Sequence, residues 1–435
     1  MRDEARAVRL DVALYAIGAA VAGVAALSDR IPIQREWGRI AFAPYTAGAV
    51  AATVLALAWR RRPARRPVLA RAALLIAVIG GVALLPLGLE VRWRAHSGFR
   101  DHVQSETLVT EESAGAVLEG EDPYAASFAN GDLGAWPPGT AEHVPYMPGM
   151  FVFGLPSALA GPGAATDARL AFAGVALAVL AAALALSDAP GSRRITALAV
   201  VVALPTGARY MAGGGDDVTV LSLMLLSLVL LERRGPGWAG VVAALAAVIK
   251  QTAWPLLPFL VVAARDSGGR PARGRALGAV SAVVVPVVLP FVLWNPGAFV
   301  EDVVLFPFGL AKDRTLAASP TLGSLIAEAL PVGKGVVAGA LMILVLVVAA
   351  YLLFVRPPVD ARGAAERAAL VLALAILFAT AGRFGYLLYP IGLFAWARLI
   401  LATDAQGVHG GTSAGAETIR WSRREGARAA KGSGL

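Results

Sequence analysis

Acidic side chains are concentrated in one segment of this chain, residues 90–146. The segment holds ten Asp or Glu residues against three Arg, together with three of the four His residues. The chain has no cysteine, so any chemistry here depends on oxygen and nitrogen groups. A carboxylate can take a proton from a hydroxyl group, and a segment of this length is uncommon unless it has a task. Residues 90–146 are therefore the first candidate for a functional site.

The middle of this segment has the pattern of a helix. Asp101 can act as its N-cap, Gln104 is suitable for the third helical position, and Gly120 followed by Pro123 can end it. Apolar residues between these ends can form a stripe. We expect an amphipathic helix that lies on the outer surface of a membrane.

Asp101 and Glu106 are the two acids of this helix with a possible catalytic role. They lie five residues apart, about 140° around a helix, so both can face one cavity only if the helix begins between them or bends. Capping is the alternative role for Asp101, and a solvated helix face is the alternative for Glu106.

Cationic candidates occur farther along the chain. Lys250 is the only Lys among the first 300 residues, and it separates two short apolar segments where a charge is costly without a partner. We expect Lys250 to bind a phosphate group, with snorkelling to the membrane interface as the alternative. Arg209 and Arg383 are lesser candidates for the same task.

A glycine-rich turn, residues 213–215, precedes Asp216 and Asp217. The Lys-Ser/Thr part of a Walker phosphate loop is absent, so a tight turn between helices is the simpler interpretation of the glycines. Hard cations prefer carboxylate oxygen, which makes a divalent ion at Asp101, Asp216 or Asp217 an alternative. We predict no metal and no cofactor.

The elements that hold these residues must cross a membrane. Hydrophobic residues make up 57% of the 435 residues and charged residues only 16%, far from the composition of a soluble domain. We predict an all-α polytopic membrane protein with about twelve transmembrane helices. The apolar segments are residues 10–27, a segment ending near 59, then 72–89, 171–186, 195–211, 218–231, 238–249, 254–264, 277–293, 336–355, 368–381 and 386–401; a shorter piece, 148–160, is expected only to dip into the membrane.

Charge distribution orients these segments. Six Arg residues and no acid lie between residues 60 and 71, which places that loop and both termini in the cytoplasm and explains the net charge of +9 without nucleic acid. We predict a single transmembrane domain, residues 1–403, with extracytoplasmic loops at 90–147 and 294–334, and a disordered cytoplasmic tail, 404–435. Residues 213–217, Lys250 and Arg383 then lie on the same outer side as the acidic segment.

Two sequence blocks carry a resemblance to a known group of enzymes. The first is Gly-x-Asp-Pro-Tyr at residues 120–124, followed by His-x-x-Tyr-x-Pro at 143–148. The second runs from ARYMAGGGDD to the Lys-containing stretch AVIKQTAW. Together they resemble the GT-C superfamily of polytopic glycosyltransferases, and within it the bacterial mannosyltransferases that use polyprenyl-phosphate-mannose.

The resemblance implies that the catalytic acid lies in the first large outer loop, where Asp101 is our preferred base and Glu106 its neighbour or substitute. It also implies a substrate site that contains the Tyr after the Asp-Pro turn, the His-x-x-Tyr pair and the cations named above. The implied substrate-binding residues are His143, Tyr146, Tyr124, Asp216, Asp217, Lys250, Arg209 and Arg383. Interfacial anchoring is the alternative for His143 and Tyr146.

From the residues and the resemblance together we predict a glycosyltransferase of the bacterial cytoplasmic membrane. It would move a hexose, with mannose as the first candidate, from a polyprenyl-phosphate donor to a hydroxyl of a glycolipid or glycan acceptor on the outer face, with inversion. The alternative is a transporter or flippase of a lipid-linked sugar, because broken helices also suit alternating access.

Overall fold

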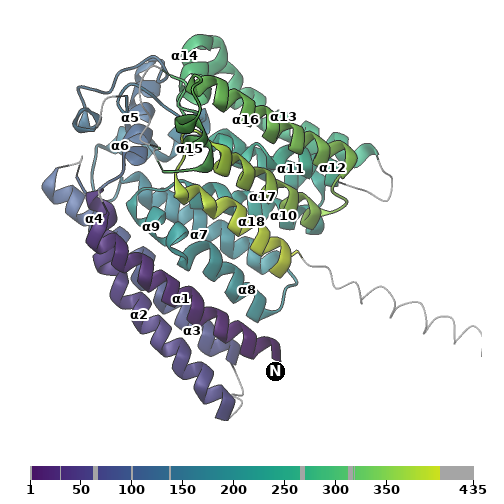
Figure 1. The fold of residues 1–435 in the computed structure, drawn as a ribbon. Coiled ribbons are helices and arrows are strands. Elements are labelled where there is room, and N and C mark those ends of the chain that lie inside the picture. The colour runs from purple at the N-terminus through teal and green to yellow at the C-terminus, as the bar shows by residue number, and fades with distance from the viewer. Residues whose placement is uncertain are drawn as a thin grey trace, which may run out of the picture. The chain divides into compact units, whose positions relative to one another are not determined.

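The computed structural model describes residues 2–29, 31–61, 67–98, 101–136, 139–264, 270–311, 317 and 319–401. Its contacts divide the chain into residues 1–401 and 402–435, and the tail predicted to be disordered lies outside the described residues. The described ranges contain helices and no strand, which confirms the all-α fold (Figure 1).

The α-helices are α1 (Arg2–Ser28), α2 (Pro32–Arg61), α3 (Pro67–Ile79), α4 (Leu85–Ser97), α5 (Ser105–Glu119), α6 (Leu155–Ala160), α7 (Ala168–Leu186), α8 (Gly191–Leu198), α9 (Pro205–Gly213), α10 (Asp217–Arg233), α11 (Pro236–Ile249), α12 (Leu256–Ala263), α13 (Arg270–Trp294), α14 (Pro296–Val300), α15 (Leu322–Ala329), α16 (Lys334–Ala350), α17 (Ala361–Phe378) and α18 (Leu388–Leu399). Short π and 3₁₀ turns join them: η1 (Gly80–Leu84), η2 (Asp132–Ala135), η3 (Pro148–Phe153), η4 (Ala199–Ala203), η5 (Gln251–Ala253), η6 (Glu301–Leu305), η7 (Tyr351–Val355) and η8 (Phe384–Leu387).

Each of the twelve predicted apolar segments is helical in the structure. By length and composition, six stretches of the described residues can cross a membrane: Arg6–Ser28, Pro32–Trp59, Val68–Ser97, Ala168–Leu186, Ala272–Trp294 and Lys334–Val355. Gly191–Ala203 and Pro205–Gly213 form a seventh if the pair, bent by 50°, is one span. The predicted helices are confirmed, whereas twelve full crossings are more than these lengths support, because α10, α11, α12 and α18 each have 17 residues or fewer.

The first two helices show how small residues allow close packing between apolar helices. A Cβ at Gly38 of α2 would lie 2.6 Å from the carbonyl oxygen of Ala22 in α1, so only glycine fits there. Trp37 next to it is buried and donates its indole N–H to the carbonyl of Val82 at 2.8 Å. Close backbone contact and satisfied polar groups are what helix packing in lipid requires.

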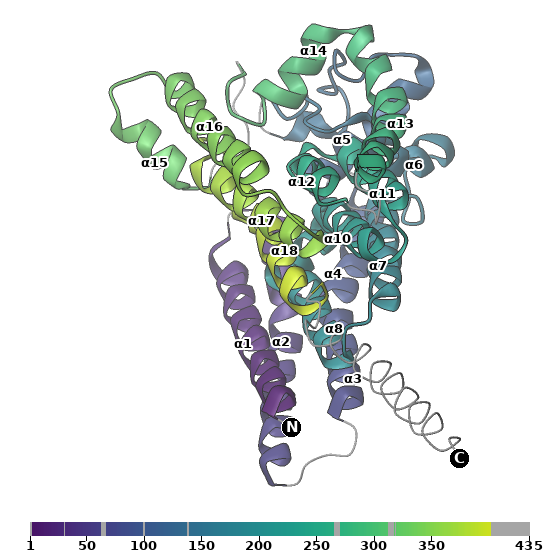
Figure 2. The same ribbon diagram turned by 90° about the vertical axis from the view of Figure 1, so that its right-hand side faces the viewer.

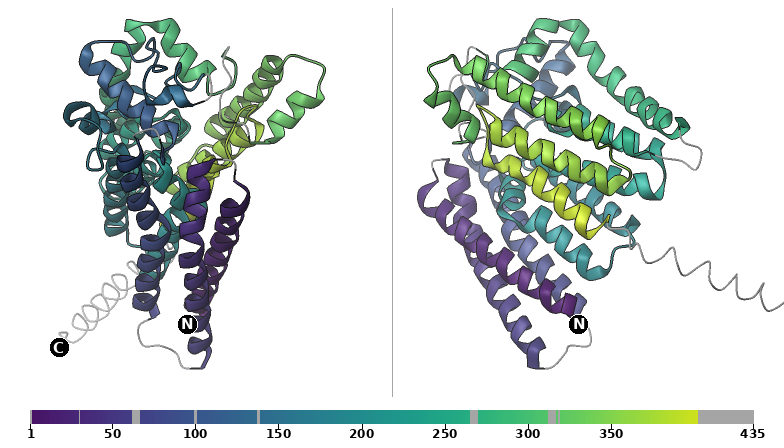
Figure 3. Two further views of the ribbon diagram at one scale, coloured as in Figure 1. Left: turned by 90° about the vertical axis from the view of Figure 1, so that its left-hand side faces the viewer. Right: turned by 45° about the vertical axis from the view of Figure 1, so that its right-hand side comes forward.

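The predicted functional segments lie at one end of the helices of residues 1–401. Figure 1 shows α5, α6, α14 and α15 at this end, while the N-terminus of α1 lies at the opposite end, and the two views of Figure 3 agree. Figure 2 shows α15 to α18 on one side of the same group of helices and α11 and α13 on the other. We call the end that carries α5 and α14 the loop end.

Two expectations about the acidic segment are wrong. Glu90 does not begin a loop, because α4 continues to Ser97 and Glu90 is fully buried in it. The helix of the segment, α5, begins at Ser105 rather than after Asp101 and does not lie on a surface, since ten of its residues are buried against protein. Residues 148–160 form η3 and the six-residue α6, which is too short to cross a membrane.

Candidate active site

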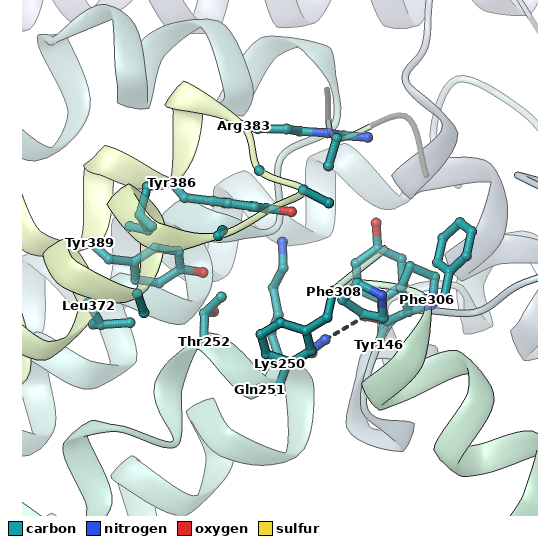
Figure 4. A pocket seen from close by; sticks show the side chains of 18 of the residues that line it. Tyr146, Lys250, Gln251, Thr252, Phe306, Phe308, Leu372, Arg383, Tyr386 and Tyr389 are labelled. Carbon is teal, nitrogen blue, oxygen red and sulfur yellow. Dashed lines mark hydrogen bonds between the residues drawn. The ribbon is translucent and has the colours of Figure 1, made fainter. Parts of the chain in front are cut away.

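One cavity of about 230 Å³ opens among the elements of the loop end. Its wall is formed by the start of α5, the segment 140–146 before η3, the turn at η5, residues after η6, the end of α17, and η8 with α18 (Figure 4). Segments that are far apart in the sequence therefore meet here. Of the predicted substrate-binding residues, His143, Tyr146, Lys250 and Arg383 line this cavity.

Lys250 lies at the break between α11 and α12, where its ammonium group is almost fully buried. Its Nζ atom is 3.0 Å from an oxygen of Asp216 and 2.6 Å from Oδ1 of Asp217. The hydroxyl of Tyr389 donates to the same Asp217 oxygen at 2.7 Å. Burial opposes the charge of Lys250, but the two carboxylates raise its pKa above the ordinary value.

Aromatic rings enclose the same ammonium group. The Nζ atom lies 5.4 Å from the ring centres of both Tyr146 and Tyr386, within the range of a cation–π contact. Burial raises the pKa of Asp216, although Lys250 lowers it. Lys250 is thus a paired and buried charge rather than one that snorkels to the interface.

The second cation of the cavity is Arg383, in the turn between α17 and η8. Its Nη1 atom contacts Oε1 of Glu106, a largely buried acid in the first turn of α5. Arg383 lines the cavity, as does Ser105, the residue before Glu106, while Glu106 itself is not part of the wall. The contact joins residues 277 positions apart in the sequence.

His143 is held by a residue that sequence reasoning missed. Its Nδ1 atom is 2.6 Å from Oδ1 of Asp302 in η6, and the other oxygen of Asp302 accepts the amide of Val144 at 2.7 Å. Phe306 stacks on the imidazole with ring centres 4.2 Å apart. Burial raises the pKa of Asp302, although His143 and the Val144 amide lower it.

The apolar part of the cavity is formed mainly by α17. Leu372, Ala375, Ile376 and Ala379 follow the spacing i, i+3, i+4, i+7 and line one face of that helix and its C-cap. A smaller cavity of about 20 Å³ between α16 and α17 shares Ala375, Ala379 and Phe308 with the larger one. The apolar wall thus continues from the charged groups toward the gap between these two helices.

Besides Glu106, Asp216 and Asp217, three further predicted residues lie outside the cavity wall. Asp101 is exposed in the bend before α5. Arg209 pairs with Asp29 at 3.1 Å. Tyr124 is buried in an aromatic cluster, where it donates its hydroxyl to the carbonyl of Tyr146 at 2.9 Å and so supports the cavity from behind.

The glycine turn packs helix against helix. A Cβ at Gly213 would lie 2.8 Å from the side-chain Nε2 atom of Gln104. The backbone N–H of Gln104 donates to the carbonyl of Gly213 at 2.9 Å. These contacts fix the start of α5 beside Asp216. Among the described residues, no group of three or more His, Asp or Glu side chains has the geometry of a metal site.

Sequence reasoning also missed Tyr386 and Tyr389. They follow Arg383 at intervals of three residues, a spacing that puts all three on one side of a helical turn and could have indicated a shared role. Asp302 had no such signal, because its partner His143 is 159 residues away.

Comparison with known proteins gives one match. The sequence model of glycosyltransferase family 87 matches residues 145–381, a range that includes η3, Lys250, Asp302 and the α17 wall. No curated protein and no solved structure matches the chain. The match covers more than half of the 435 residues and agrees with the all-α, multi-span fold, so this chain belongs to glycosyltransferase family 87, a family of membrane glycosyltransferases.

Proposed function

We propose that this chain transfers a hexose, with mannose as the first candidate, from a polyprenyl-phosphate donor to a hydroxyl of a glycolipid or glycan acceptor, with inversion. The observation that carries the proposal is a single cavity with two cations at one end and an apolar wall along α17. A lipid-linked phosphate is complementary to this cavity, because it has an anionic head and an apolar chain. We further propose that the cavity faces the outside of a bacterial cytoplasmic membrane and that both termini are cytoplasmic.

The cationic end suits the donor phosphate. Arg383 lines the cavity with a guanidinium group, which matches phosphate oxygens in pairs, and Lys250 adds a second positive charge nearby. The rings of Tyr146 and Tyr386 are available to the sugar, since aromatic faces and hydroxyls both line the same space. His143, fixed by Asp302, is a further hydrogen-bonding group on that side.

The apolar end suits the lipid chain. The wall of α17 continues into the small cavity next to α16, and the outer side of α16 exposes large aliphatic residues such as Val336 and Ile343. An isoprenoid chain could follow this path from the bilayer while its phosphate stays near Arg383. Phe308, which lines both cavities, marks the point where they meet.

The proposed reaction needs one base and no covalent intermediate. The acceptor hydroxyl gives its proton to a carboxylate as its oxygen forms a bond to the anomeric carbon. The bond from that carbon to the phosphate oxygen breaks, and its electron pair leaves with the polyprenyl phosphate, where cations stabilise the new charge. Glu106 is the better placed base because it contacts a cavity residue, whereas Asp101 is exposed.

The test is transfer of radiolabelled mannose from polyprenyl-phosphate-mannose by the purified chain in nanodiscs, with a membrane extract as the acceptor source. We expect a labelled product, and a loss of turnover on the order of 10² to 10⁴ in Glu106→Gln, the usual contribution of a general base. Asp101→Asn should retain most of the activity.

Two outcomes would contradict the proposal. Absence of a labelled product with mannose-, glucose- and arabinose-linked donors would remove the transferase activity on this donor class. Movement of the intact donor across sealed proteoliposomes, without transfer, would support the flippase alternative instead. Loss of activity in Asp101→Asn but not in Glu106→Gln would keep the function and assign the base to Asp101.

A further inference from the structure

Both cations of the cavity already have anionic partners. Within the described part of the chain, Lys250 and Arg383 are the Lys and Arg residues that line the cavity. Lys250 contacts Asp216 and Asp217, and Arg383 contacts Glu106, so three carboxylates face two cations. A phosphate group that enters adds further negative charge, and a carboxylate must therefore give up its cation or take up a proton.

The two cations differ in how easily they can change partner. Lys250 has a side chain that is 5% exposed, and Tyr389 holds one of its two carboxylates in place. Arg383 has a side chain that is 26% exposed, comes from a turn and pairs with one carboxylate. Arg383 is therefore the cation that a phosphate can take over at the lower cost.

The Glu106 carboxylate loses its main partner when Arg383 moves to the phosphate. Its side chain is 9% exposed, and its remaining hydrogen-bond contact is the Ser105 hydroxyl at 3.5 Å, which is at the limit of a hydrogen bond. A buried carboxylate that loses its cation becomes harder to ionise and hence a stronger base. The other titratable groups that face Glu106 are Tyr146, Tyr386 and Asp216, none of which brings a positive charge.

We propose that Arg383 is a shared partner that holds Glu106 in the empty cavity and passes to the phosphate when the donor binds. The exchange rests on the proposed function, because the donor phosphate triggers it. It keeps Glu106 paired until a donor is present, and it then leaves the carboxylate free to accept the proton of the acceptor hydroxyl. Donor binding would thus prepare the base.

Binding without transfer tests this exchange. The probe is farnesyl methyl phosphate, a prenyl phosphodiester with no sugar whose phosphate does not titrate near pH 7, added to the full chain in nanodiscs. Calorimetric titration at pH 7 reports the affinity of the parent and of each variant for this probe.

The Glu106→Gln variant should bind this probe more tightly, on the order of tenfold, because the competing charge-assisted contact to Arg383 is gone. Glu119→Gln, the same change at an exposed position of the same helix, is the matched control and should bind like the parent. Thermal unfolding of each variant confirms that it is folded.

Arg383→Gln gives a second measurement that does not depend on Glu106→Gln being folded. It should bind the probe more weakly than the parent. Equal affinity in the parent and Glu106→Gln, or weaker binding in Glu106→Gln, would overturn the exchange while leaving the transferase proposal intact. Absence of binding in the parent and in every variant would overturn both the exchange and the proposed donor class. The transfer assay tests the donor class independently of the exchange.

Discussion

Glu112 illustrates how one side chain of α5 depends on its surroundings. It accepts the amide of Leu133 at 3.4 Å, and burial raises its pKa from 4.5 to about 7. Because the folded state favours the protonated form, the contribution of Glu112 to stability is complete below about pH 4.5 and is lost as the pH rises through 7. Glu112→Gln keeps the neutral shape and removes this dependence.

We therefore expect Glu112→Gln to melt at a higher temperature than the parent at pH 8 and at nearly the same temperature at pH 5. The measurement is thermal unfolding in one detergent at both pH values. Glu119→Gln, at the exposed end of the helix, is the control and should match the parent at both. A Glu112→Gln variant less stable than the parent at pH 8 would contradict the assignment.

The four glutamates of α5 show the limit of prediction from sequence at this scale. Glu106 pairs with Arg383, Glu111 pairs with Arg94, Glu112 is half-buried near η2, and Glu119 is exposed. In the sequence all of them fit a solvated helix face. Their partners lie far along the chain or on other helices, so no local pattern could separate one from another.

At the scale of elements, an ion network attaches α5 to the transmembrane helices. Arg94 of α4 donates to Glu111 of α5 at 2.6 Å and to Asp167, the N-cap of α7, at 2.8 Å. Glu111 also accepts the amide of Ala168 at 3.0 Å. All three charged side chains are buried, so α5 is held in place near its middle, at Glu111.

Removal of this attachment should destabilise the fold strongly. Arg94→Ala leaves Glu111 buried without its cation, at a cost of roughly 3 to 5 kcal/mol. Arg398→Ala removes a half-exposed cation from Glu366 and should cost at most about 1 kcal/mol. Chemical unfolding of both variants in the same detergent checks the difference, and equal, small losses would mean that Arg94 does not anchor α5.

The start of α5 shows why element boundaries escaped prediction. Asp101 and Gln104 have the pattern of a capping box, but Gln104 is itself the N-cap. The preceding residues are held outside the helix by tertiary hydrogen bonds, from the Gln104 amide to Gly213 and from Arg169 to the His102 carbonyl at 2.8 Å. The positive φ of His102, 57°, prevents the helix from starting earlier.

At the scale of the whole membrane domain, the apolar runs predicted every major helix, because a backbone in lipid must satisfy its own hydrogen bonds. They also predicted that Lys250 and Arg383 lie at the end that carries the acidic segment, and the structure brings them into one cavity. They did not predict which acid meets which cation, since those pairs depend on side-chain packing between helices.

The orientation of this domain can be tested with single cysteines, because the native chain has none. Ser127 is exposed at the loop end. Val359 is 55% exposed and follows α16 and η7, which lead away from the loop end. In intact cells we expect Ser127→Cys to react with a membrane-impermeant maleimide and Val359→Cys to react only after the membrane is opened. The opposite pattern would place the cavity on the cytoplasmic side.

The shortness of α11 affects the lipid around it. Its 14 residues span about 21 Å, roughly 9 Å less than a typical hydrocarbon core. Exposed Trp238 and Trp254 lie near its two ends, where indole rings favour the headgroup region. A bilayer can adapt to such a short apolar helix by thinning locally, so we expect it to be thinnest beside the helix that leads to Lys250. Under the proposed function, a donor phosphate there would come closer to the level of the cavity without leaving its own leaflet.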